Sequence, residues 1–481
     1  MLFNSLEYPF FFLMVIFFHF TLPHSFRWLF LLISSYFFYM CWRVNYATLM
    51  LLSTVVDYFC ALGIDRSKSI SIRKLLLGIS LSFNLGLLFT FKYYNFFIHE
   101  IHIFCQTYGI AIFLPDLQLL LPVGISFYTF QTMSYTIDVY TRRIPAESHF
   151  GYFALYISFF PQLVAGPIER ASHLLPQFRE KKVFDPAQTV EGLRRILWGM
   201  FKKVVIADHL AGYVNLVYAT PDRYQGPQFW IATYFFAFQI YCDFSGYSDI
   251  AIGSARILGY DLMENFRHPY FARTIPEFWG RWHISLSTWF RDYLYVPLGG
   301  NRVAITRWYF NLMIVFLVSG LWHGANWTFL VWGFLHGAYQ LITLRIKKYQ
   351  LAAIQKKKSS LADSSPYWLT IFLVLLNFHL VCIAWIFFRA KTLSEAFYIL
   401  THLFSWTSGK ESLALSFGNT NLALGILYIF FLLGIEGLQE FFRWDIDRFP
   451  LLLRWSIYYL LIFGILYLGV FDVHEFLYFQ F

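Results

Sequence analysis

Residues 308–344 of the chain have the sequence WYFNLMIVFLVSGLWHGANWTFLVWGFLHGAYQLITL. Two apolar runs, Trp308–Leu321 and Trp327–Leu344, lie on either side of His323. Trp308–Leu321 is short of the ~20 residues that span a bilayer, which is typical of tilted or re-entrant helices around an interior cavity. An ionisable side chain is costly at membrane depth, so His323 is a candidate functional residue. Gly320 and Gly324 would let the chain bend beside it.

The rest of the chain has the composition of a membrane protein. Hydrophobic residues make up 58% of its 481 residues and charged residues only 14%, against roughly 25% charged in soluble domains. No soluble fold of this size buries so much apolar surface. We therefore predict an all-α polytopic membrane protein with 10 to 12 crossings. The remaining candidate runs are approximately Tyr8–Leu22, Trp28–Trp42, Tyr46–Ile64, Leu75–Phe97, Leu119–Tyr140, Tyr152–Val164, Phe229–Ile257, Trp368–Phe388, Leu422–Leu438 and Leu453–Val470.

The formal charge of +9 indicates membrane topology rather than nucleic-acid binding. Lysine and arginine gather in three stretches between apolar runs, within residues 66–74, 170–203 and 345–358. This pattern is typical of cytoplasmic loops. Bases precede the last apolar run, whereas Asp472 and Glu475 follow it with no base after them. We therefore predict that the C-terminus lies outside the cytoplasm.

Two segments are too polar to face lipid. Thr189–Tyr218 alternates basic and apolar residues at helical spacing, which predicts an amphipathic helix at the cytoplasmic interface. Glu277–Tyr295 carries Arg281, His283 and Arg291 among large aromatic residues, so it must line a protein cavity or lie at an interface.

Two motifs hold most of the chemical information, FWGRWHISLS at residues 278–287 and GLWHGANWT at residues 320–328. His323 alone is also compatible with a structural histidine that is hydrogen-bonded between helices. His336 lies 13 positions further on, nearly on the opposite helical face, and is interpreted as a packing or capping residue. Asp243 and Asp249 either form ion pairs or line the site. No spacing of cysteines or histidines indicates a metal site.

Taken with these motifs, QLVAGPI at 162–168 and YCDFSGYSD at 241–249 resemble the membrane-bound O-acyltransferase (MBOAT) family. The similarity is to its bacterial branch typified by the alginate O-acetyltransferase membrane subunit, and Gly280 departs from it where many relatives have arginine. The resemblance implies one MBOAT domain over residues 1–481, with short re-entrant helices around a central tunnel. Its signature core is about 119–345, and a C-terminal helix with an aromatic tail occupies about 450–481.

The resemblance also implies the roles of residues. His323 matches the essential histidine, which would take the proton of an attacking hydroxyl. His283 matches a second polar position, which would donate to the oxyanion or orient the acceptor. The substrate-binding residues that we expect around the tunnel are Trp282, Arg291, Asp292, Trp322, Asn326 and Asp243. Bases of residues 170–203 and Arg291 would make the cytoplasmic mouth of the tunnel positive, which suits coenzyme A.

The function implied is acyl transfer from a cytoplasmic thioester, acetyl-CoA by resemblance, to hydroxyls of a cell-surface polysaccharide. The chain would lie in the bacterial inner membrane, bind no cofactor, and act with an extracytoplasmic esterase-like partner. One alternative is D-alanyl transfer to teichoic acid from a carrier protein. An alternative of another class is a transporter or flippase, which usually shows repeated halves with broken helices, and no such repeat is visible.

The C-terminal sequence FLYFQF, residues 476–481, leaves two interpretations open. Tyr478 is either an aromatic anchor at the membrane interface or, as in a similar tail of polymer-acylation systems, an acyl relay. A phenol can attack a thioester once its proton is removed, and the resulting aryl ester is a reactive donor. The relay requires the tail to fold back toward His323.

Overall fold

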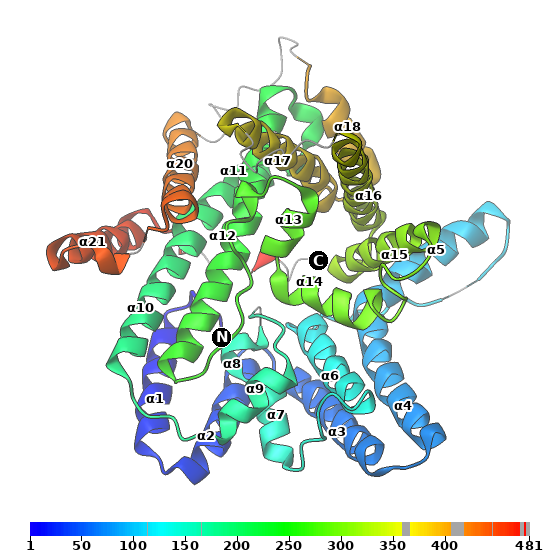
Figure 1. The fold of residues 1–481 in the computed structure, drawn as a ribbon, viewed down its shortest axis with the longest axis vertical. Helices are drawn as coiled ribbons and strands as arrows, with labels where there is room; N and C mark the ends of the chain where they lie inside the picture. Colours follow the sequence, from blue (N-terminus) through cyan, green and yellow to red (C-terminus); the bar gives the residue numbers. More distant parts are fainter. Residues whose placement is uncertain are drawn as a thin grey trace. The chain divides into compact units, whose positions relative to one another are not determined.

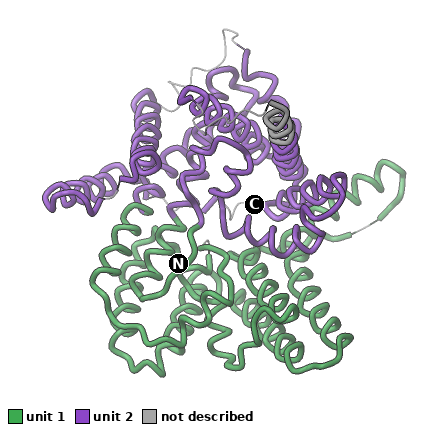
Figure 2. The backbone as a smooth tube through the Cα atoms, viewed as in Figure 1, with its two compact units in different colours: residues 1–199, 247–264, 480 green, residues 200–246, 265–479, 481 purple. Residues whose placement is uncertain are grey.

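The computed structural model describes residues 1–112, 114–164, 166–357, 366–405, 418–444, 446–471 and 476–477. All regular secondary structure within these ranges is helical (Figure 1). The helices divide into two compact units, of which residues 1–199 and 247–264 form most of the first (Figure 2). Residues 200–246 and the described residues beyond 264 form the second. The predicted signature core, about 119–345, contributes to both.

The first unit contains the N-terminal helices and the C-terminal part of α12 (Pro227–Ile257). Its other elements are α1 (Glu7–Thr21), α2 (His24–Met40), α3 (Val44–Arg66), α4 (Ile70–Leu88), η1 (Phe89–Tyr93), α5 (Tyr94–Thr107), α6 (Ile125–Tyr140), α7 (Phe150–Ser158), α8 (Phe160–Leu163), α9 (Ala171–Arg179) and α10 (Pro186–Met200).

The second unit contains the N-terminal part of α12 and both histidine motifs. Its other elements are η2 (Phe201–Ala207), α11 (Asp208–Ala219), η3 (Pro221–Arg223), η4 (Pro269–Phe271), α13 (Ile275–Arg281), α14 (Ile284–Phe290), η5 (Arg291–Tyr295), α15 (Ile305–His323), α16 (Trp327–Lys357), α17 (Tyr367–Arg389), α18 (Leu393–His402), α20 (Asn419–Phe442), η6 (Ile446–Arg448) and α21 (Leu451–Leu468).

Six helical stretches in the described residues are long and apolar enough to cross a membrane. They are α3, the continuous stretch from α4 through α5, α15, α17, α20 and α21. The protein is therefore all-α and polytopic, as the sequence predicts. Fewer helices of the described residues meet these criteria than the 10 to 12 predicted crossings, partly because the predicted run Tyr152–Val164 forms two short helices, α7 and α8.

The helices α15 and α16 pack closely through two glycines. A Cβ atom on Gly320 would lie 2.3 Å from the carbonyl oxygen of Phe329, and one on Gly333 would lie 2.3 Å from that of Phe316. Small residues allow membrane helices to approach this closely. The contact fixes the end of α15, where His323 is the last helical residue.

The interfacial helix predicted over Thr189–Tyr218 is wrong in its second half. The chain there forms part of α10, then the π-helix η2 and most of α11. All residues of η2 are buried, including Lys202 and Lys203, which are 3% and 2% exposed. These lysines pair inside the protein, so they do not belong to a solvent-facing positive mouth.

Candidate active site

His323 is buried among aromatic rings at the end of α15. Its side chain is 3% exposed. The imidazole centroid lies 4.9 Å from the Trp332 ring and 5.2 Å from the Phe388 ring, both edge-on. Such a setting excludes bulk water, which strengthens electrostatic interactions with a reacting group.

His283 lies directly before α14 and has a left-handed backbone conformation, with φ of 43°. This region is sparsely populated by residues other than glycine, and such strain is frequent at functional sites. The side chain is completely buried. Burial lowers the pKa of His283 to about 3, so its imidazole is neutral at physiological pH.

Asn265 fixes the protonation of the His283 ring. Its Oδ1 atom accepts a hydrogen bond from the backbone N–H of Ser285 at 3.3 Å, so this atom is an acceptor. The same oxygen lies 3.1 Å from Nδ1 of His283, which must then carry the proton. The neutral ring consequently has its lone pair on Nε2.

Three histidines of the second unit are connected through tryptophan rings. The Trp322 ring lies 6.0 Å from His283 and 5.0 Å from His323. The Trp332 ring lies 4.9 Å from His323 and 4.9 Å from His336. His336 is fully buried, and its Nδ1 accepts the indole N–H of Trp279 at 3.3 Å. The predicted pair His283 and His323 is thus brought into one cluster, to which His336 also belongs.

The other predicted site residues of the two motifs differ in their exposure and in their contacts. Trp282 and Trp322 are buried, 1% and 4% exposed. The Arg291 side chain is 60% exposed and pairs with Asp292 at 2.8 Å. Asn326 caps α16, because its Oδ1 accepts the backbone N–H of Thr328 at 3.0 Å while its amide donates to the Lys391 carbonyl at 2.9 Å. Its side chain is therefore already occupied by capping.

Both acids of the YCDFSGYSD motif form ion pairs. Asp243 lies 2.7 Å from Nζ of Lys203. Asp249 accepts a hydrogen bond of 2.9 Å from Arg195, which also binds Glu264. The sequence leaves ion pairing and site lining open for these two acids, and in the structure each of them forms an ion pair.

A cavity of about 520 Å³ lies beside the histidine cluster. The Glu277–Tyr295 segment supplies about half of its wall, as the polarity of that segment predicts. The wall also includes Ser319, one helical turn before His323 on α15, and Gln340, one turn after His336 on α16. Arg291 is the charged residue among those that line it, and a Cβ atom on Gly280 would meet nothing within 4 Å.

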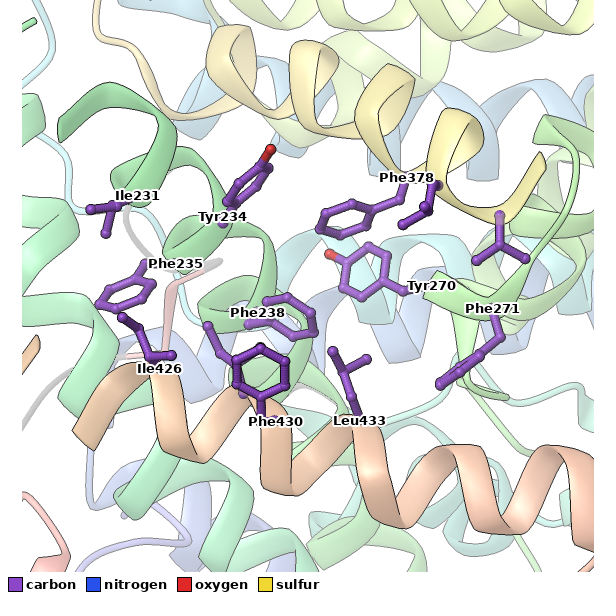
Figure 3. A pocket seen from close by; sticks show the side chains of 13 residues that line it. Ile231, Tyr234, Phe235, Phe238, Tyr270, Phe271, Phe378, Ile426, Phe430 and Leu433 are labelled. Carbon is purple, nitrogen blue, oxygen red and sulfur yellow. The ribbon is translucent and has the colours of Figure 1, made fainter. Parts of the chain in front are cut away.

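A second cavity, of about 480 Å³, has an apolar wall formed by α12, η4, α17 and α20 (Figure 3). Both tyrosine hydroxyls in its lining are already engaged: Tyr234 contacts His379 at 2.9 Å and Tyr270 donates to the Ala237 carbonyl at 2.6 Å. This cavity suits an apolar chain and offers no cation for a phosphate.

The sequence does not reveal Asn265, and the interpretation of His336 as a packing or capping residue stays a prediction. Asn265 lies outside both motifs, and no spacing relates it to His283, 18 positions later. The expectation that His336 faces away from His323 assumes one straight helix. The helix that contains His323 ends at that residue, and the chain turns at Gly324. Tyr478 lies outside the described residues, although Phe476 and Leu477 before it are buried.

The chain belongs to the membrane-bound O-acyltransferase family. The model of that family matches residues 141–385, a region that contains both histidine motifs. The fold, the buried histidine cluster and this match make the protein a membrane O-acyltransferase.

Individual relatives cover most of the chain. The probable alginate O-acetylase AlgI of Azotobacter vinelandii is 36% identical over 94% of this chain and 87% of its own length. The peptidoglycan O-acetyltransferase of Helicobacter pylori is 37% identical over 77% of this chain and 72% of its own. The teichoic acid D-alanyltransferase of Bacillus subtilis is 26% identical over 58% of this chain and 71% of its own.

Proposed function

We propose that the protein transfers an acetyl group from a cytoplasmic acetyl-CoA thioester to hydroxyls of a cell-surface polysaccharide. Transfer to the polymer is completed by an extracytoplasmic esterase-like partner, and the chain lies in the bacterial inner membrane. The observation that supports this most is the joint burial of His323 and His283 around Trp322. The relatives that act on alginate and peptidoglycan cover much more of this chain than the D-alanyltransferase does.

His323 is the general base in this proposal. It removes the proton of the acceptor hydroxyl as the hydroxyl oxygen attacks the thioester carbonyl. Collapse of the tetrahedral intermediate breaks the carbon–sulfur bond, and the proton passes from the imidazolium to the leaving thiolate. The step is balanced without any net gain or loss of protons.

His283 orients the acceptor rather than stabilising the oxyanion. Its Nδ1 proton is directed at Asn265, and its neutral Nε2 carries a lone pair. A lone pair accepts a hydrogen bond from a hydroxyl but cannot donate one to an oxyanion. The lone pair on Nε2 therefore favours the orienting role of His283 over the donor role.

The cavity of about 520 Å³ is the proposed site for the donor. Arg291 at its wall supplies positive charge for the phosphates of coenzyme A. A Cβ atom on Gly280, which lines this cavity, would meet nothing within 4 Å, so this position leaves room for the donor. Trp279 is part of the same wall and hydrogen-bonds His336, so the cavity borders the histidine cluster.

Tyr478 is the proposed intermediate acceptor, which carries the acetyl group as an aryl ester to the partner. The supporting observation concerns its neighbour Phe476, whose ring lies 5.4 Å from Phe244, and the Phe244 ring lies 4.6 Å from His283. The chain immediately before Tyr478 is therefore one aromatic ring away from the histidine cluster.

The test is polymer acylation in cells that carry His323→Ala. Removal of a general base typically costs ~10²–10⁴ in rate, so ester content should fall to background while the protein level stays normal. His379→Ala, a histidine of α17 outside the cluster, should retain wild-type ester content. Mild base then releases the esters, and their identification as acetate or D-alanine decides between the two donors. More than half of wild-type acylation in His323→Ala would exclude it as the base.

A further inference from the structure

A buried ionic cluster lies at the junction of η2, α11 and α12 in the second unit. Nζ of Lys203 is 2.7 Å from Oδ1 of Asp208 and 2.7 Å from Oδ1 of Asp243. The three side chains are 2%, 4% and 4% exposed. Burying a carboxylate is costly unless the oxygen that does not face its counter-ion also accepts a hydrogen bond. Oδ2 of Asp243 therefore needs a donor of its own.

The C-terminal segment supplies that donor. The backbone N–H of Leu477 donates a hydrogen bond of 2.8 Å to Oδ2 of Asp243. Hydrogen bonds from neutral donors to a carboxylate are stronger than those between neutral groups. Lys203 occupies the other oxygen of the same carboxylate, so the two contacts do not compete.

Apolar contacts complete the attachment. Phe476 and Leu477 are 1% and 4% exposed, although they lie near the end of the chain. Phe476 packs at a tilt of 61° against Phe244, the residue after Asp243.

A second attachment precedes the first along the chain. The backbone N–H of Val470, just after α21, donates 2.9 Å to the carbonyl oxygen of Val204 in η2. Val204 is the neighbour of Lys203, so both attachments use η2. Long π-helices are rare and are frequently found at functional sites.

We propose that Lys203, Asp208 and Asp243 form a docking site for the C-terminal segment of the same chain. The carboxylate of Asp243 captures a backbone N–H, Lys203 holds that carboxylate in place, and the ring of Phe244 receives Phe476. Docking fixes the positions of Phe476 and Leu477 relative to Phe244 and His283. The docking does not depend on whether Tyr478 carries an acyl group, so it goes beyond the function proposed above.

The test measures how fast a thiol placed in the segment reacts with a maleimide. The full chain is used in lipid nanodiscs with Cys41→Ser, because Cys41 is the exposed cysteine among the five. Leu477→Cys keeps the backbone N–H and reports on docking. Phe471→Cys, at a position that is 52% exposed, gives the rate of an accessible thiol.

Docking predicts that Leu477→Cys reacts about ten- to hundredfold more slowly than Phe471→Cys, which reflects one charge-assisted hydrogen bond and burial. Adding Asp243→Ala should remove most of this difference. Asp57→Asn is the matched control, because Asp57 is a buried acid of α3 whose carboxylate accepts a hydrogen bond from Asn84 of α4. It should leave the slow rate unchanged.

A second pair of variants keeps the cluster intact, in case Asp243→Ala does not fold. The thiol is placed at Phe476→Cys, and Leu477→Pro is compared with Leu477→Ala. Proline lacks the N–H that donates to Asp243. The thiol at position 476 should therefore react at least about tenfold faster in the Leu477→Pro variant than in the Leu477→Ala variant. Equal rates for proline and alanine, or a Leu477→Cys thiol as reactive as Phe471→Cys, would overturn the proposal.

Discussion

At the scale of single residues, the side chain that decides the chemistry of His283 is Asn265. Asn265→Ala removes the acceptor that holds the Nδ1 proton, so the ring can adopt the other tautomer. Loss of one such hydrogen bond costs ~1–3 kcal/mol, which corresponds to about 5- to 150-fold in rate.

Steady-state kinetics with varied acceptor should show this loss in kcat/KM for the acceptor, with the KM for the donor unchanged. Asn377→Ala is a matched control, since Asn377 is also a buried asparagine of the second unit and donates to the Ala272 carbonyl. An Asn265→Ala enzyme with wild-type kinetics would mean that the tautomer of His283 has no effect on the reaction.

Substitutions at Leu477 test whether docking of the C-terminal segment affects polymer acylation. If docking positions Tyr478 for the relay, Leu477→Pro should lower polymer acylation at least about tenfold, because it removes a charge-assisted hydrogen bond, whereas Leu477→Ala should retain most of it. The ester content of the polymer measures both. Equal acylation by the two variants would separate the docking of the tail from the reaction.

At the scale of helices, the contact between α15 and α16 should control the position of His323. Gly320→Ala places a Cβ atom 2.3 Å from a carbonyl oxygen, so the helices must separate. Overpacking of this kind costs ~1–3 kcal/mol. We expect a lower midpoint of thermal unfolding and loss of acylation. Gly434→Ala, on α20 with nothing within 4 Å, should change neither.

The cavity lined by α13–α16 can be filled without moving the helices. Gly280→Trp adds a large side chain where a Cβ atom meets open space. If the donor binds there, the KM for the donor should rise while thermal stability stays near that of the wild type. Gly434→Trp carries the same ring on a helix away from this wall. Unchanged donor kinetics in Gly280→Trp would locate the donor elsewhere.

The sequence identifies the helices and the burial of His323 between two of them, because apolar runs and a histidine between two of them are local signals. It also indicates that Glu277–Tyr295 lines a cavity or lies at an interface, because that segment is too polar to face lipid. It does not reveal that Lys203 is buried, because a lysine near the end of a basic stretch resembles any cytoplasmic lysine until Asp208 and Asp243 are placed around it. Asn265 is missed because its contact with His283 depends on the turn between them.

At the scale of the whole molecule, the placement of the two ends of α21 tests the predicted topology. Arg448 precedes this span and Phe471 follows it, and both are exposed. In a Cys41→Ser background, a membrane-impermeant maleimide should label Phe471→Cys in intact spheroplasts. It should label Arg448→Cys only after the membrane is permeabilised. The reverse pattern would put the C-terminal segment in the cytoplasm and exclude an extracytoplasmic relay.

Acetylation of the protein itself tests three parts of the proposal in one measurement: the side from which the donor enters, the role of His323 as base, and the relay through Tyr478. Labelled acetyl-CoA is supplied to sealed proteoliposomes on the face that bears Arg448, and the C-terminal peptide is then analysed by mass spectrometry. We predict an alkali-labile acetyl group on Tyr478 in the wild type, and none in Tyr478→Phe or His323→Ala. Equal acetylation in His323→Ala, or acetylation only when donor is supplied to the opposite face, would contradict acyl transfer through the His323 centre.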